Sequence, residues 1–254
     1  MKVNYSYVYL AFFLLLNIFN FVDRNLLIAF APQIKSEFNL TNVQWGLLTG
    51  VYFLFFYSVF GIFMGVLGDK FSRMKIAAAG VFLWSLMTAF TGVAKNFSHL
   101  IVARALIGVG ESALTPNAIS MLSDLFKQNQ RGTASAIYYL GIPLGVGFGM
   151  LIAAFFGPAY GWRLVFITLG LIGMGLGVVT YFLIEPRRGQ LDISFDENNK
   201  STSIRDIISM TKHALYNSKC LTFVIIGSIF LHIPLGAGNF EVLWAVNERG
   251  FTAS

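Results

Sequence analysis

Seven long apolar segments limit what this chain can fold into. Each is long enough to cross a bilayer, which takes about 20 residues. Of the 254 residues, 56% are hydrophobic and 12% are charged, about half the charged share of a soluble domain. The runs are too long and continuous for strands, so we expect an all-α membrane protein. The segments lie at 7–31, 43–67, 76–94, 98–124, 133–157, 163–184 and 220–245.

Composition and motifs exclude several other classes of protein. The single cysteine, Cys220, excludes an intrachain disulfide. The net charge of +6 is spread between the apolar segments and forms no basic face, so we expect no nucleic-acid partner. The first apolar segment is too long for a cleavable signal peptide. No Walker loop, His-Glu-x-x-His or Gly-x-Ser-x-Gly motif is present, so we expect neither an enzyme nor a cofactor.

The distribution of Lys and Arg predicts the orientation of the chain. Most of these residues fall at one set of segment ends, for example at 70–75, 127–131 and 187–219. Because positively charged loops stay on the cytoplasmic side, we expect a cytoplasmic N-terminus and a C-terminus outside. The expected location is the inner (plasma) membrane, crossed several times.

One long polar connection, at about 185–219, divides the chain. We expect a six-helix bundle at 1–188 and a cytoplasmic linker at 189–218 that contains a short amphipathic helix. The seventh span and the start of a second bundle then occupy 219–254. Six spans, a linker and a further span are typical of a two-halved transporter.

Two acids and two arginines interrupt the apolar segments. Asp23 and Arg24 are adjacent in the first segment, and Arg104 and Glu111 lie in the fourth. A spacing of seven residues puts Arg104 and Glu111 on one helix face, about two turns apart. Charges at membrane depth cost at least about 2.5 kcal/mol each, so they need partners in a protein interior or a water-filled cavity.

These four charges suggest a coupling mechanism. Desolvation favours the neutral form of a buried carboxyl, whereas a nearby arginine favours its anion. If an arginine moves to a substrate anion, the released carboxyl can take a proton. We therefore expect Asp23 to carry the proton, with Glu111 second, and Arg24 and Arg104 to face the anion. The alternative is an ion-pair network that only holds the helices together.

Other polar residues are candidates for the wall of the cavity or for moving parts. Packing explains the cavity candidates equally well; they are Asn20, Tyr138 and Asn117. Gly65, Asp69 and Arg73 lie in the loop after the second span, where Asp69 and Arg73 can pair with each other or with Asp124. Such a cluster is a candidate gate, and an ordinary positive-inside loop is the alternative.

The fifth span contains glycines at every second position and Pro143. Glycines at this spacing favour close helix packing, which is the structural explanation that we prefer. The functional alternative is that this span bends at Pro143 during transport. A similar kink is expected at Thr115-Pro116-Asn117.

The sequence resembles the major facilitator superfamily. Gly65–Lys75 is similar to the family's motif between the second and third spans, G-x-L-x-D-R-x-G-R-K, with Lys70 and Ser72 departing from it. Arg104 matches the family's arginine in the fourth span. More narrowly, the stretches Asn-Phe-Val-Asp-Arg, Gly-Val-Gly-Glu-Ser, Asp-Leu-Phe and Ile-Pro-Leu-Gly-Val-Gly resemble the spinster-like branch.

This resemblance implies a twelve-span fold built from inverted triplets of helices, of which this sequence contains the first half and the seventh span. Five spans are absent, so we expect a fragment. The branch carries lysolipids and sphingoid phosphates, and its bacterial members are proton-coupled exporters. The resemblance implies that Asp23 is the proton site, with Arg24, Arg104 and Glu111 as its partners.

We therefore expect a proton-coupled secondary transporter of amphipathic, lysolipid-like organic anions. Its partners are a small-molecule or lipid substrate, protons and membrane lipids, and we expect a monomer. Sugar-acid symporters carry similar motifs, so a sugar-acid or other organic-anion symporter is an alternative, as is a truncated fragment that does not transport. A seven-span receptor is disfavoured because its N-terminus would lie outside.

Overall fold

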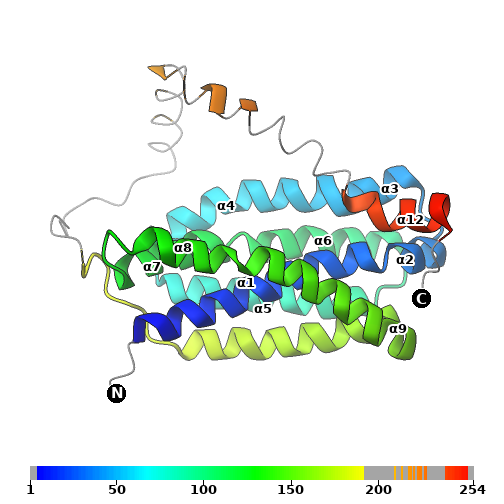
Figure 1. The fold of residues 1–254 in the computed structure, drawn as a ribbon, viewed down its shortest axis with the longest axis horizontal. Coiled ribbons are helices and arrows are strands. Elements are labelled where there is room, and N and C mark those ends of the chain that lie inside the picture. Colours follow the sequence, from blue (N-terminus) through cyan, green and yellow to red (C-terminus); the bar gives the residue numbers. More distant parts are fainter. Residues whose placement is uncertain are drawn as a thin grey trace.

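The computed structural model describes residues 5–191 and 238–250, together with residues 209, 213, 217, 218, 220, 222–224, 226 and 227. Every regular element in these parts is helical. Figure 1 shows a bundle of long helices that lie side by side. The elements are α1 (Tyr5–Ala29), α2 (Ala31–Phe38), α3 (Asn42–Gly46), a π-helical turn (Leu47–Val51), α4 (Tyr52–Lys70), α5 (Arg73–Gly92), α6 (Phe97–Glu111), α7 (Leu114–Leu125), α8 (Arg131–Tyr139), α9 (Gly141–Phe182), a 3-10 turn (Gly238–Phe240) and α12 (Glu241–Arg249).

Five helical stretches of the described residues are long and apolar enough to cross a membrane. The last of them, Arg131–Phe182, contains 52 residues and reverses at Gly161, where φ is 71°. Only glycine adopts such a backbone easily. Figure 1 shows α9 running along the bundle and returning, so this stretch contains both the fifth and the sixth predicted spans. The all-α prediction is confirmed.

Two of the spans are interrupted shortly before a proline. Proline lacks an N–H group, and its ring clashes with the carbonyl four residues earlier. The fourth span divides between α6 and α7 at Ser112, four residues before Pro116. The fifth divides between α8 and α9 at Leu140, just before Pro143. The helices are therefore interrupted about one turn before Pro116 and Pro143, while the backbone at Ser112 and Leu140 keeps right-handed helical angles.

Glycines let α9 approach its neighbours closely. A Cβ on Gly145 would lie 2.5 Å from the Cβ of Phe21 on α1. A Cβ on Gly173 would collide with the Ser85 hydroxyl on α5. Gly147, by contrast, faces open space. The glycine-rich fifth span thus packs closely against α1, as the packing interpretation of its glycines predicts.

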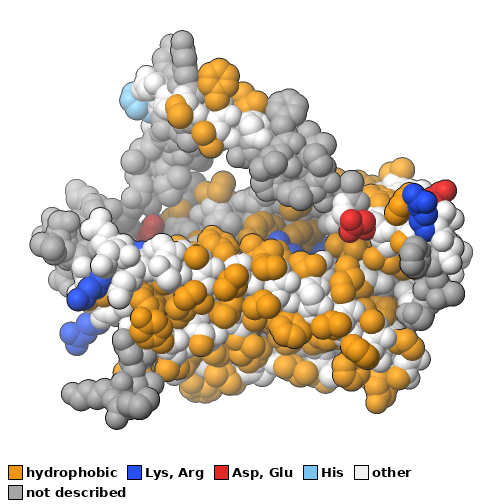
Figure 2. All heavy atoms as spheres, viewed as in Figure 1, with side chains coloured by type: hydrophobic (Ala, Val, Ile, Leu, Met, Phe, Trp, Pro, Cys, Tyr) orange, Lys and Arg blue, Asp and Glu red, His pale blue; other side chains and the backbone are white. Residues whose placement is uncertain are grey.

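The outer surface of the bundle suits a lipid environment. In Figure 2 hydrophobic side chains cover the visible long side, and charged side chains gather near its ends. α4 is the most exposed of the spans, and Leu54, Phe55 and Ile62 are more than half exposed.

The segment 238–250 packs against the end of the bundle where α1 stops. Trp45 Nε1 donates a hydrogen bond of 3.1 Å to the carbonyl of Asn239. The Phe240 ring lies against Gly46, and Leu243 is buried. The start of α1 lies at the opposite end (Figure 1). Most of the predicted linker at 189–218 and part of the predicted seventh span at 220–245 fall outside the described residues.

Candidate functional site

Helices α1 and α6 bring the four predicted charges together in the middle of the bundle. Asp23, Arg104 and Glu111 are buried, and the side chain of Arg24 is 20% exposed. Arg24 Nε donates to Glu111 Oε2 at 2.6 Å, forming an ion pair between the two helices. Arg24 and Glu111, both expected as partners of Asp23, therefore pair directly with each other.

Aromatic rings cover both guanidinium groups. The guanidinium of Arg24 lies 4.7 Å from the ring centre of Phe53, and that of Arg104 lies 4.6 Å from the same ring. Arg24 also lies 4.8 Å from the ring centres of Phe21 and Tyr57. Stacked on rings, an arginine stays charged while its planar face is covered.

Several polar atoms of this cluster have no hydrogen-bond partner among the described residues. They are Arg104 Nε, Asp23 Oδ2, Glu111 Oε1 and Asn20 Nδ2. The carboxyl groups of Asp23 and Glu111 themselves lie within hydrogen-bonding reach of each other. Arg104 also interacts electrostatically with both Asp23 and Glu111.

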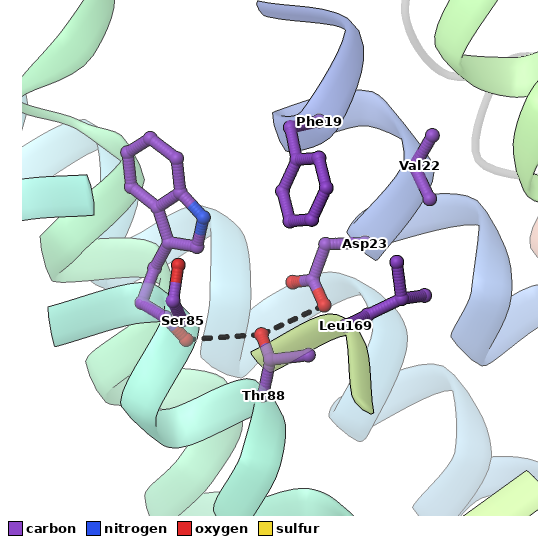
Figure 3. Close-up of a pocket in the computed structure, with 7 residues that line it drawn as sticks. Phe19, Val22, Asp23, Ser85, Thr88 and Leu169 are labelled. Carbon is purple, nitrogen blue, oxygen red and sulfur yellow. Dashed lines mark hydrogen bonds between the residues drawn. The ribbon is translucent and has the colours of Figure 1, made fainter. Parts of the chain in front are cut away.

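One oxygen of the Asp23 carboxyl faces α5, while the carboxyl also lies within hydrogen-bonding reach of Glu111. Thr88 Oγ1 lies 2.8 Å from Asp23 Oδ1 and donates to it when the carboxyl is ionised. Figure 3 shows the carboxyl of Asp23 and the Thr88 hydroxyl facing each other in a small pocket, which Trp84, Ser85 and Leu169 also line.

Tyr138 is also buried and lies close enough to Arg24 and Tyr57 to interact with them electrostatically, but its hydrogen bonds run to other residues. Its hydroxyl is 3.1 Å from Thr115 Oγ1, and its carbonyl accepts a hydrogen bond from Asn17. These contacts join α8 to α7 and α1. The structure therefore gives Tyr138 a packing position between helices.

A second cluster, centred on Arg73, lies at the end of the bundle where α4 stops and α5 begins. Its Nη1 donates to Asp124 Oδ2 at 2.6 Å and to Ser120 at 2.9 Å. Its Nε donates to Glu185 at 3.0 Å, and its Nη2 donates to the carbonyl of Pro186. Among the described residues Arg73 forms ion pairs with Asp124 and Glu185 and none with Asp69, which decides between the two predicted pairings.

Two residues of this cluster are missing from the sequence prediction. Glu185 binds Arg73, and Arg188 donates to the carbonyls of Gly68, Asp69 and Phe71. Burial alone would raise the pKa of Glu185, but hydrogen bonds from Ser72 and Arg73 outweigh it and lower that pKa. The signal available in the sequence was Glu-Pro-Arg-Arg directly after the sixth span.

A cavity of about 380 Å³ adjoins this second cluster. Gly65, Asp69, Arg73 and Asn117 line it, together with Pro116 and Ser120. Asn117 is one of the residues expected to line a cavity. The structure places it in the wall of this one, beside Gly65, Asp69 and Arg73, because α7 turns this face toward the end of α4.

Comparisons with known proteins agree with this arrangement. The sequence model of the Major Facilitator Superfamily matches residues 13–253. The chain belongs to the major facilitator superfamily. It is therefore a multi-pass membrane protein, and the six described spans are those of that fold.

Relatives of the chain are spinster proteins. The sphingosine-1-phosphate transporter SPNS2 of Danio rerio is 31% identical over 205 residues, which cover 79% of this chain and 40% of that protein. Protein spinster of Drosophila melanogaster is 31% identical over 82% of this chain and 35% of its own length. The chain thus spans less than half the length of these relatives.

A solved structure has the same fold. The crystal structure of a bacterial homolog of the human lysosomal transporter Spinster, in an inward-facing and unoccupied conformation, superposes with a TM-score of 0.81 at 25% identity. The match covers 100% of this chain and 58% of that one. An occupied inward-facing form of such a homolog gives a TM-score of 0.73 at 28% identity.

Proposed function

We propose that this chain belongs to a proton-coupled secondary transporter of amphipathic, lysolipid-like organic anions. The observation that carries the proposal is the buried cluster of Asp23, Arg24, Arg104 and Glu111 between α1 and α6. The similarity to a sphingosine-1-phosphate transporter supports the substrate class.

The surroundings of the arginines suit an amphipathic anion. A phosphate or carboxylate pairs well with the planar donors of a guanidinium. Phe21, Phe53 and Tyr57 surround the same guanidinium groups with apolar surface, which suits an alkyl chain attached to the headgroup. Arg24 is partly exposed and is the first arginine that an incoming anion would meet.

The charge balance of the cluster supports proton coupling. With both acids ionised the four side chains sum to zero, so an anion bound by Arg24 adds an uncompensated negative charge in a buried site. Such a charge is costly there. A proton taken up by Asp23 or Glu111 restores the balance. Anion binding to Arg24 also competes with Glu111, whose carboxylate is then released to accept that proton.

The Arg73 cluster is proposed as a gate at the end of the bundle where α4 stops and α5 begins. Arg73 on α5 joins α7 through Asp124 and the residues after α9 through Glu185. Any movement that separates these elements must break buried ion pairs. Gly65 and Asp69 line the adjacent cavity, and Pro143 follows the interruption at which α8 and α9 can change their angle.

The topology that we propose has a cytoplasmic N-terminus in the inner (plasma) membrane and a monomeric chain. The bundle at 1–188, the linker at 189–218 and the segment from 219 onward are its proposed parts. The Arg73 cluster then lies at the cytoplasmic end, where the Lys and Arg residues at 70–75 are also found.

Reconstitution of the chain in proteoliposomes tests the substrate class. We expect uptake of a labelled lysophospholipid, and a loss of at least tenfold in Arg104→Gln. The matched control is Arg163→Gln, which removes an arginine that is partly exposed at the end of the bundle. Uptake of a hexuronate alone would assign the protein to the sugar-acid symporters. Absence of both uptake and binding for either ligand would show a chain that does not transport by itself.

A further inference from the structure

Thr88 on α5 is the one hydroxyl that the described residues place against Asp23. Its Oγ1 lies 2.8 Å from Asp23 Oδ1 and 2.9 Å from the backbone carbonyl oxygen of Trp84. Both side chains are buried. Figure 3 shows the hydroxyl between these two oxygen atoms.

A hydroxyl group has one hydrogen to donate and two lone pairs with which to accept. The carbonyl of Trp84 can only accept, and an ionised Asp23 can also only accept. If Asp23 is ionised, Thr88 has one hydrogen for two acceptors, and one of the two short contacts is left without a proton. If Asp23 carries a proton on Oδ1, Asp23 donates to Thr88 and Thr88 donates to Trp84. Both distances are then true hydrogen bonds.

Other threonines in the bundle show where the hydrogen of Thr88 goes. Thr49, Thr91 and Thr180 each donate their hydroxyl to the carbonyl four residues earlier, at 2.7–2.9 Å. This bond is a regular habit of threonine in helices. Thr88 makes the same bond to Trp84, so its lone pairs are the part that faces Asp23.

Two further polar groups line the pocket around this contact, Ser85 Oγ and Trp84 Nε1, but neither makes a hydrogen bond to Asp23. The pocket holds about 200 Å³ of empty space, but this is too thinly spread to admit a water molecule. Close packing of Gly170 and Gly173 on α9 against Ala89 and Ser85 fixes α5 in place. The hydrogen bonding of Asp23 Oδ1 on this side therefore depends on Thr88.

In the part of the chain that the structure describes, the charged neighbours of Asp23 come from α1 and α6. Arg104 and Arg24 attract its carboxylate, and Glu111 contacts its side chain. The neighbours in the pocket on α5 and α9, Trp84, Ser85, Thr88 and Leu169, are uncharged. Thr88 thus lies on the side of Asp23 where no cation competes for it.

We propose that Thr88 is a positioning residue that accepts a hydrogen bond from protonated Asp23 and passes its own hydrogen to Trp84, so that it stabilises the proton-bound form. This role rests on the proposed function, in which Asp23 carries the proton. It gives α5 a contact that exists in full only while the proton is bound.

Infrared titration of the purified chain in lipid tests this role without requiring transport. The carbonyl stretching band of protonated Asp23 is assigned by its loss in Asp23→Asn, and its intensity is followed against pH. In Thr88→Val, which has nearly the same shape, we expect the midpoint to move to lower pH by about one unit, since a hydrogen bond of about 1–2 kcal/mol to the acid is lost. In Thr88→Ser the midpoint should stay close to that of the wild type.

Thr91→Val is the matched control, because Thr91 makes the same bond to Met87 one turn further along α5. It should leave the midpoint unchanged. A midpoint that moves to higher pH in Thr88→Val would show that Thr88 donates to the carboxylate instead, and an unchanged midpoint would show a purely structural residue. Either result overturns the inference and leaves the proton site intact. Absence of any titrating Asp23 band in the wild type would overturn both.

Discussion

Arg24 on α1 and Glu111 on α6 form an ion pair of 2.6 Å across 87 residues of sequence, with the carboxylate fully buried. Removing one member of a buried pair leaves an uncompensated charge, which typically costs about 3–5 kcal/mol. We therefore expect Arg24→Gln and Glu111→Gln each to destabilise the chain strongly, and the double variant to lose much less than the sum. Denaturation in detergent micelles measures this coupling. Additive losses would show that the two side chains do not interact.

The pair Glu37–Arg163 serves as the control for that cycle. It has the same distance of 2.6 Å, but its side chains are 43% and 36% exposed. Exposed pairs contribute about 0–1 kcal/mol, so its double-mutant cycle should show little coupling.

The same exposed pair predicts a dependence on pH. Burial alone would raise the pKa of Glu37, but hydrogen bonds from Arg163 and Trp162 outweigh it, so this pKa lies below its ordinary value of 4.5. A lowered pKa stabilises the fold above the ordinary value, and the contribution is lost as the pH falls through the folded-state pKa. Glu37→Gln should therefore lower the melting temperature slightly at neutral pH and not in strong acid. A difference that grows with acidity would contradict this assignment.

Arg73 should be irreplaceable by lysine. Its planar group serves Asp124, Ser120, Glu185 and the carbonyl of Pro186 at once, and a lysine ammonium cannot reach all four from one position. We expect Arg73→Lys to destabilise the chain by about 2 kcal/mol or more, because Asp124 is buried. Lys70→Ala, at an exposed site nearby, is the control. Equal melting temperatures for Arg73→Lys and the wild type would contradict the arrangement.

Alanine substitutions at two glycines of α9 distinguish the effect of close packing from that of helix propensity. A Cβ at Gly173 would collide with Ser85, whereas Gly175 faces open space. Gly173→Ala should cost about 1–3 kcal/mol through overpacking. Gly175→Ala should be neutral or slightly stabilising, because alanine favours a helix. Thermal unfolding of the two variants measures the difference, and equal effects would show that α5 and α9 are not in close contact.

The sequence was sufficient to predict the first six spans and the charged cluster. Asp23, Arg24, Arg104 and Glu111 stand out because charges are rare in apolar segments, and the structure brings all four to one place. The interruptions before Pro116 and Pro143 follow from a local rule about proline. Such features depend on residue type and spacing, which are visible without coordinates.

Contacts that depend on how helices face one another were not visible. Thr88 looks like any threonine in a span, and only the packing of α5 on α1 puts its hydroxyl beside Asp23. Phe53 is one of 26 phenylalanines, and nothing in the sequence marks it as the ring between two arginines. Asn117 lies beside Gly65, Asp69 and Arg73, and the direction in which α7 faces was likewise not visible in the sequence.

The most direct test of proton coupling is pH-gradient-driven flux of a labelled lysophospholipid in proteoliposomes, measured for the wild type and for Asp23→Asn at equal protein density. The account predicts that the gradient accelerates flux in the wild type. In Asp23→Asn it predicts that exchange of substrate persists but no longer responds to the gradient. A variant whose flux still follows the gradient as the wild type does would contradict the assignment of Asp23 as the proton site.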